Sequence, residues 1–252
     1  MAKVITVNNL PSKAEVKSLA VDTTAQRRAE LALVGQTDEE IMARLKDRFE
    51  ILEDMTRACK AGKVRAMIVT GPPGVGKSFG VEKVLSKHDV FADVANDSKL
   101  KKYEVVKGAM SAIGLYKKLY EFSDKKSILV FDDCDSVLLD DLSLNILKAA
   151  LDTSKKRTIH WNTDSRLLRQ EGVPNSFEFN GGCIFITNIK FDHVKSKKLR
   201  DHLEAIESRC HYLDLTIDTT REKLLRIRQV VRRSEEHTSE LQSLRHLVCR
   251  LL

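Results

Sequence analysis

The sequence lacks any apolar run that approaches the roughly 18 residues needed to cross a bilayer. Residues 1–11 also lack the continuous apolar core of a signal peptide. The cysteines before residue 233 form no CxxC or Cys/His spacing, so neither a zinc site nor a disulfide framework is indicated. We therefore expect no membrane partner and a reducing, cytoplasmic location.

The end of the chain differs in character from the rest. The run RSEEHTSELQS at 233–243, followed by LVCRLL at 247–252, resembles the in-frame translation of a sequencing adapter. We therefore interpret residues 233–252 as a non-native tail and leave them out of the fold prediction, with an ordinary polar helix as the alternative. We expect the natural gene to continue past residue 232.

The chain carries a formal net charge of +7 and a pI of about 9.1. An excess of this size is compatible with a phosphate-bearing partner but does not identify one. Basic residues are densest at 155–157 and at 195–200. Solvated faces are the simplest interpretation of both groups, and contact with nucleic acid is the alternative.

Residues 37–216 alternate short apolar runs with helical stretches, a pattern typical of a parallel sheet covered on both faces. Strands are predicted at Met67–Thr70, Tyr103–Lys107, Ser127–Phe131, Cys183–Thr187 and His211–Leu215. Helices are predicted at about 37–61, 77–86, 111–122, 142–151 and 196–206. The fold class is therefore α/β, with a doubly wound, five-stranded parallel sheet.

Three segments surround or interrupt this core. Residues 1–36 are polar and weakly periodic, which favours a flexible N-terminal arm ahead of the N-terminal helix. Residues 154–182 predict a β-insert, in which packing is the favoured role of Trp161. Residues 217–232 predict an amphipathic helix that begins a C-terminal helical lid, truncated by the tail.

The run GPPGVGKS at Gly71–Ser78 lies between a predicted strand and a predicted helix. A triphosphate needs converging backbone N–H groups, which a glycine-rich loop at a helix N-terminus provides. Lys77 is expected to reach the β- and γ-phosphates, and the Ser78 hydroxyl to bind Mg²⁺. The predicted cofactors are therefore ATP and Mg²⁺. The predicted nucleotide-binding residues are Gly71, Pro72, Pro73, Gly74, Val75, Gly76, Lys77, Ser78 and Phe79.

The run SILVFDD at 127–133 places two carboxylates at the end of an apolar strand. Asp132 is predicted to hold the Mg²⁺ shell, and Asp133 to polarise the attacking water. Asp135 is expected either to cap the following helix or to belong to the site. Together with the phosphate loop, these residues predict an ATPase.

Over residues 64–230 the chain resembles the AAA+ superfamily of ring-forming ATPases, which commonly carries Asp then Glu at this strand end. Asp133 stands where that glutamate is expected, so the resemblance implies intact binding and slow hydrolysis. Asn188 matches the sensor-1 position, although asparagine at a strand end is also a common turn former. Arg209 matches the arginine finger, which acts on a neighbouring subunit's nucleotide and implies a homo-oligomeric ring; a plain surface arginine is the alternative.

The triplet Ser208-Arg209-Cys210 is similar to one that replication clamp loaders carry at this place. The resemblance favours an ATP-driven machine of viral or mobile-element origin that acts on DNA or on replication proteins. A protein-remodelling ATPase is the second possibility, but its usual aromatic pore loop is missing from GAMSAI at 108–113. A nucleotide-binding switch subunit with little turnover is the third, because Asp133 is a short acid.

Overall fold

The computed structural model describes residues 28–31, 33–86, 102–162, 165–189, 191, 194–217 and 219–235. Their core is a five-stranded, all-parallel sheet with the order β2-β3-β6-β1-β7. The strands are β1 (Ala66–Thr70), β2 (Tyr103–Lys107), β3 (Ile128–Asp132), β6 (Gly182–Thr187) and β7 (His211–Asp214). The predicted α/β class and five parallel strands are confirmed, with each strand within one residue of its predicted bounds.

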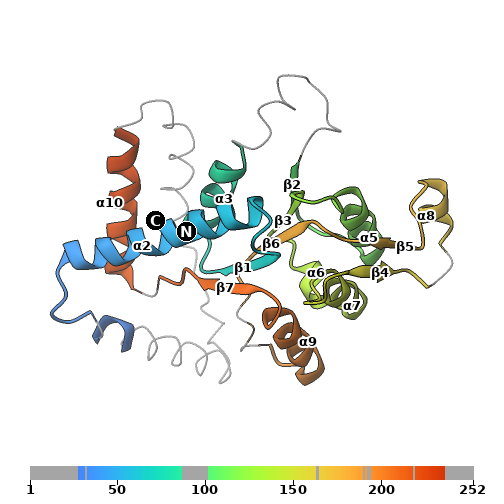
Figure 1. Ribbon diagram of the computed structural model, residues 1–252. Coiled ribbons are helices and arrows are strands. Elements are labelled where there is room, and N and C mark those ends of the chain that lie inside the picture. The colour runs from blue at the N-terminus through green and yellow to red at the C-terminus, as the bar shows by residue number, and fades with distance from the viewer. Residues whose placement is uncertain are drawn as a thin grey trace, which may run out of the picture.

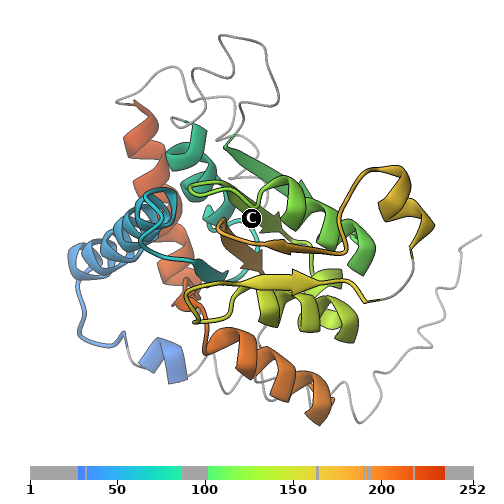
Figure 2. The ribbon, with the colours of Figure 1, turned by 45° about the vertical axis from the view of Figure 1, so that its right-hand side comes forward.

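Helices cover both faces of this sheet (Figures 1 and 2). One face carries α2 (Asp38–Lys60), α3 (Lys77–Leu85) and α10 (Thr220–Glu235). The other carries α5 (Ala112–Glu121), α6 (Ser136–Leu139), α7 (Asp141–Ala150) and α9 (Lys197–Glu207). Among the described helices, none is both long and apolar enough to cross a membrane.

The central strands are buried on both faces, and their side chains alternate between two cores. In β1, Met67 and Val69 pack with α2 and α3, whereas Ile68 packs with α5 and α7. The edge strands β2 and β7 are less buried along their length. A continuous apolar run therefore forms a central strand, because both of its faces are covered.

The first long helix begins where the sequence predicts. Thr37 caps α2 through a reciprocal capping box with Glu40, and three acidic residues fill its first turn. Its buried stripe packs on α3 and on α10. Arg44 pairs with Glu222 of α10 over 2.8 Å, so the predicted lid helix lies directly against α2 (Figure 1).

The predicted β-insert is a two-stranded antiparallel sheet of β4 (Thr158–His160) and β5 (Ser176–Glu178). A short helix, α8 (Arg166–Gln170), separates the two strands and was not predicted. Trp161 is 8% exposed and lies 5.4 Å from the Tyr116 ring, between centroids. The packing role predicted for Trp161 is confirmed.

Two predicted segments lie largely outside the described residues. These are the N-terminal arm, described only at 28–31 and 33–36, and the tail, of which α10 includes only 233–235. The described end of the arm contacts α10, because Arg221 donates to the Gln36 carbonyl oxygen over 3.0 Å. Leu33 is buried there.

Candidate nucleotide site

The loop after β1 has the backbone of an anion cradle. Gly71, Gly74 and Gly76 have φ values of 148°, 81° and 98°, a region that side-chain-bearing residues rarely adopt. A Cβ on Gly71 would lie 3.0 Å from the Leu215 backbone, so only glycine lets the loop pass this close. Gly76 caps α3 without a side-chain hydrogen bond, which leaves the helix N-terminus open to an anion.

Lys77 begins α3 and is only 6% exposed. Its ammonium donates to the carbonyl oxygens of Gly71 (2.6 Å) and Pro72 (3.0 Å) and to Asn188 Oδ1 (2.7 Å). Burial lowers the pKa of Lys77, while the nearby aspartates, with Asp133 foremost, oppose that shift. The loop therefore holds one buried cation against neutral acceptors.

Ser78 and Asp132 meet beside this cation. The Ser78 hydroxyl donates to Asp132 Oδ1 over 2.7 Å, and Asp132 is 5% exposed at the end of β3. A hydroxyl and a carboxylate are the hard oxygen ligands that Mg²⁺ prefers, with water and phosphate completing its shell. Within the described residues no group of three or more His, Cys, Asp or Glu is arranged to hold a metal, so an Mg²⁺ site here would rest on these two residues.

Asp133 and Asn188 complete a chain of polar side chains. Asn188 Nδ2 donates to Asp133 Oδ1 over 3.0 Å, while Asn188 Oδ1 accepts from Lys77. Asp133 is exposed, has a left-handed φ of 50°, and donates its backbone N–H to the Ile186 carbonyl oxygen. The exposed carboxylate therefore faces solvent at the rim while Lys77 lies inside.

The sheet order explains why these residues meet. The carboxyl ends of β1, β3 and β6 are neighbours, with Thr70 opposite Thr187 and Asp132 opposite Ile186. The chain order reverses between β1 and β6, and ligands of open α/β sheets bind at such reversal points. The glycine cradle, the buried Lys77 ammonium and the Ser78 and Asp132 oxygens have the chemistry that would fit a nucleoside triphosphate with Mg²⁺.

The remaining loop residues divide between core and surface. Val75 is fully buried and packs with the α2 core, which anchors the loop. Phe79 is 41% exposed at the start of α3. Pro72 contributes its carbonyl to Lys77, whereas Pro73 and Gly74 form the turn between them. The buried Val75 thus fixes the loop to the core, while Phe79 is left partly exposed at the start of α3.

Two residues at the site were not assigned from the sequence. Lys107, at the end of β2, lies 3.3 Å from Asp132 Oδ2 and 3.0 Å from Glu82 Oε1. Its hydrogen bond to Glu82 is the main cause that raises its pKa. The sequence could have predicted this contact, because Lys107 and Asp132 each end a predicted strand and neighbouring parallel strands end at the same edge of the sheet.

Arg226 is the second such residue. Its guanidinium carbon lies 3.4 Å from the Phe49 ring centroid, and its Nη2 is 3.8 Å from where a Gly76 Cβ would be. The helix α10 therefore brings a stacked arginine from far along the chain to the phosphate loop. The sequence offered several arginines in this helix and no means of choosing among them.

Two further predicted residues lie outside the contacts that join Lys77, Asn188 and Asp133, although the charge of Asp135 still acts on Lys77. Asp135 accepts from the Thr187 hydroxyl over 2.7 Å and forms no side-chain cap, so it ties β3 to β6. Arg209 precedes β7 at the amino-terminal edge of the sheet, opposite the phosphate loop, and donates to the Ala205 carbonyl oxygen. Within one chain Arg209 therefore does not meet Lys77.

Fold and site together define an α/β protein compatible with a P-loop nucleotide-binding core. No model of a known protein family matches the chain. The chain is similar to an uncharacterized 36.7 kDa protein of the nrdC-mobD intergenic region of Enterobacteria phage T4, with 36% identity over 200 residues. The match covers 79% of this chain and 59% of the phage protein, so the chain spans less than two thirds of that relative.

Proposed function

We propose that this chain binds ATP with Mg²⁺ and hydrolyses it as an oligomeric ATPase of the AAA+ type. The observation that carries the proposal is the continuous contact from Lys77 through Asn188 to Asp133, beside the Ser78–Asp132 pair. A buried ammonium, an amide and two carboxylates around a glycine cradle are the groups that phosphoryl transfer to water uses.

Each residue has a distinct task in this proposal. Lys77 would donate to phosphate oxygens in place of its loop carbonyls. The phosphate would then give the buried ammonium a negatively charged hydrogen-bond acceptor, in place of neutral ones. Ser78 and Asp132 would hold Mg²⁺, which neutralises developing charge on the phosphates when bound. Asn188 would orient Asp133, and Asp133 would accept a proton from the attacking water.

The wider setting is also proposed. Action in DNA replication or DNA handling rests on the positive net charge and on the clamp-loader-like triplet at 208–210. Assembly into a homo-oligomer rests on the distance of Arg209 from its own loop, since a finger at the opposite sheet edge can only serve another subunit. A phage relative favours the host cytoplasm as the location.

One observation favours a second function, a nucleotide-dependent switch with little turnover. Asp133 is exposed at the rim and is one methylene shorter than glutamate, so water held against it is poorly shielded from bulk solvent. Binding would then alter the chain without rapid hydrolysis. Protein remodelling gains no support of this kind.

The test separates binding from turnover. Titration of a fluorescent ATP analogue, with and without Mg²⁺, is expected to show Mg²⁺-strengthened binding that Lys77→Ala weakens by roughly 100-fold. Lys83→Ala, in the same helix but paired with Glu53, is the matched control and should bind normally. Phosphate release with and without DNA then distinguishes the ATPase from the switch. Equal affinity of the wild type and Lys77→Ala would overturn both.

A further inference from the structure

A pocket of about 370 Å³ opens at the edge of the sheet opposite the phosphate loop. Its walls are the segment 59–65 before β1, residues 125–126 before β3, residues 180–182 at the start of β6, and the loop at 155–157 before β4. Because β1, β3 and β6 are parallel, their entries share one edge, and Arg65 joins the loop before β4 to it. The pocket is therefore separate from the nucleotide site.

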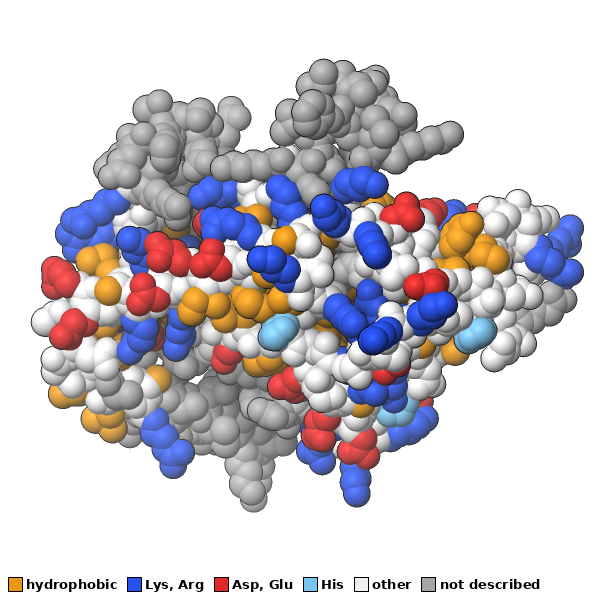
Figure 3. All heavy atoms as spheres, in the orientation of Figure 1, with side chains coloured by type: hydrophobic (Ala, Val, Ile, Leu, Met, Phe, Trp, Pro, Cys, Tyr) orange, Lys and Arg blue, Asp and Glu red, His pale blue; other side chains and the backbone are white. Residues whose placement is uncertain are grey.

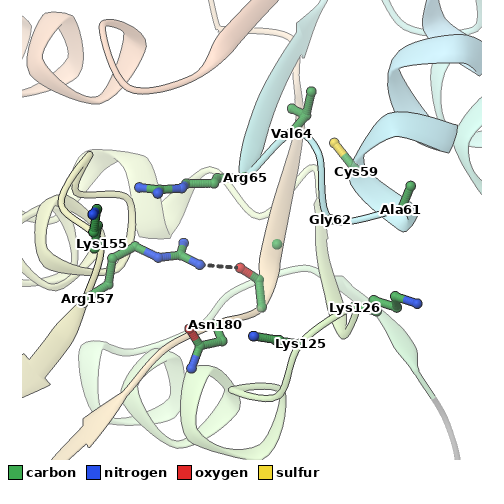
Figure 4. Close-up of a pocket in the computed structure, with 12 residues that line it drawn as sticks. Cys59, Ala61, Gly62, Val64, Arg65, Lys125, Lys126, Lys155, Arg157 and Asn180 are labelled. Atoms are coloured by element: carbon green, nitrogen blue, oxygen red, sulfur yellow. Dashed lines mark hydrogen bonds between the residues drawn. The ribbon is translucent and has the colours of Figure 1, made fainter.

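Among the described residues that line this pocket, none is acidic and five are basic: Arg65, Lys125, Lys126, Lys155 and Arg157. Figure 4 shows Arg65, Lys155 and Arg157 together on one side, with Lys125 and Asn180 facing them. Basic side chains also gather across the centre of the face in Figure 3. The positive charge is thus concentrated in a hollow, where it acts on a ligand more strongly than on a flat surface.

Arg157 is the base of the site. Its side chain is buried, with the residue 6% exposed, and it donates to the carbonyl oxygens of Ala150 (2.9 Å) and Gly181 (3.1 Å). Within the described part of the chain it forms no ion pair; Glu178 acts on it only through longer-range charge. Burial, reinforced by the charge of Arg65, lowers its pKa. A buried cation held by neutral groups alone attracts an anion.

Arg65 organises the wall that it shares with Lys155 and Arg157. Its Nη1 donates to the carbonyl oxygens of Asp152 (2.8 Å) and Ser154 (3.1 Å), which fixes the loop that carries Lys155. A guanidinium has five N–H donors, so both arginines keep donors for a ligand. The basic wall is therefore built by backbone contacts before any ligand arrives.

We propose that this pocket binds a phosphate group, supplied either by a nucleic-acid strand or by a free phosphate anion. A free phosphate carries more charge and more acceptor oxygens than a carboxylate, and a strand brings a series of singly charged phosphodiesters, so either source matches several converging cations better than one carboxylate does. The site needs no ATP turnover, since none of the phosphate-loop residues is among those that line it.

The experiment compares two charge-matched double variants by fluorescence anisotropy, with a labelled single-stranded oligonucleotide and no ATP. Lys125→Ala/Lys155→Ala removes two exposed lysines of the pocket, so the fold is preserved. Lys195→Ala/Lys197→Ala removes the same charge from the other basic group. The pocket variant should bind about tenfold more weakly, with a salt slope reduced by about 2, and the control should lose less than twofold.

A second titration uses pyrophosphate, followed by calorimetry. If the oligonucleotide does not bind but pyrophosphate binds in a pocket-dependent way, the ligand is a free anion and the proposal stands. Equal losses in the two variants would mean diffuse charge attraction and would overturn it. So would binding of neither probe to the wild type. Lys77→Ala should leave the oligonucleotide titration unchanged and remove only the pyrophosphate binding that belongs to the phosphate loop, whereas the pocket variant removes the remainder, which separates this site from the proposed ATPase.

Discussion

The Lys77 ammonium donates to Asn188 Oδ1 over 2.7 Å and so joins the phosphate loop to the end of β6. Asn188 then donates to Asp133, which follows β3. Asn188 is the middle member of this hydrogen-bonded series, so a rotation of its side chain would break its contacts with both Lys77 and Asp133. The ends of three strands are thus coupled at the position where a nucleotide's terminal phosphate is proposed to lie.

Lys77 should leave a mark on alkaline stability. Because burial lowers its pKa below the ordinary 10.5, the unfolded chain binds its proton more tightly than the folded chain does. The contribution of Lys77 to the free energy of unfolding should therefore rise with pH between that lowered pKa and 10.5. Lys77→Met removes this rise. Denaturant unfolding across alkaline pH checks it, and identical slopes for the two proteins would contradict the prediction.

Asp133 combines a left-handed backbone with its proposed role in turnover. Its φ of 50° suits Asp or Asn, whereas glutamate costs about 1 kcal/mol there. We expect Asp133→Glu to hydrolyse ATP faster while its unfolding free energy falls by about that amount. Asp133→Asn, the matched control, should keep stability and ATP binding but lose turnover. Phosphate release that is the same in all three proteins would remove Asp133 from the mechanism.

Arg209 can be tested by mixing subunits. Arg209→Ala should bind ATP but hydrolyse it slowly, and Lys77→Ala should not bind it. In a mixture, the Arg209 of a Lys77→Ala subunit can serve the intact loop of an Arg209→Ala neighbour. Phosphate release by the mixture should therefore exceed that of either variant alone. Simple averaging of the two rates would argue against action between subunits.

Arg226 should contribute to nucleotide affinity. Its guanidinium is stacked on Phe49 near Gly76, so it is held at the loop rather than in solvent. We expect Arg226→Ala to weaken ATP binding about tenfold, the effect of one charge-assisted hydrogen bond. Arg226→Lys should be intermediate because it keeps the charge but loses planar stacking. The exposed Arg228→Ala should bind normally in the same titration.

Gly181 should be intolerant of any side chain. An added Cβ would overlap the Phe122 carbonyl oxygen, which belongs to the backbone and cannot rotate away. Gly181→Ala is therefore expected to lower the unfolding free energy by about 2 kcal/mol or more. Gly172→Ala, with a φ of 70° but open space around it, should cost about 1 kcal/mol. Denaturant unfolding gives the unfolding free energy of both variants. A loss for Gly181→Ala no larger than that for Gly172→Ala would contradict the prediction.

Local patterns were sufficient to predict much of the fold. The apolar runs marked all five parallel strands, and Thr37 with its acidic turn marked the start of α2. The short helices α6 and α8 were missed because four or five residues carry too little periodicity to detect. Asp135 was assigned to a cap or to the site, whereas its partner Thr187 lies 52 residues away.

The sequence by itself determined the phosphate loop, the acidic strand end and the helical and strand periods, because each depends on neighbours within a few positions. Only the tertiary structure decided which distant residues meet. Lys107 reaches Asp132 and Arg226 reaches Gly76 because parallel strands end at one edge and α10 packs on α2. The basic pocket likewise forms only where four strand entries converge, since charge spacing along a chain does not define a hollow.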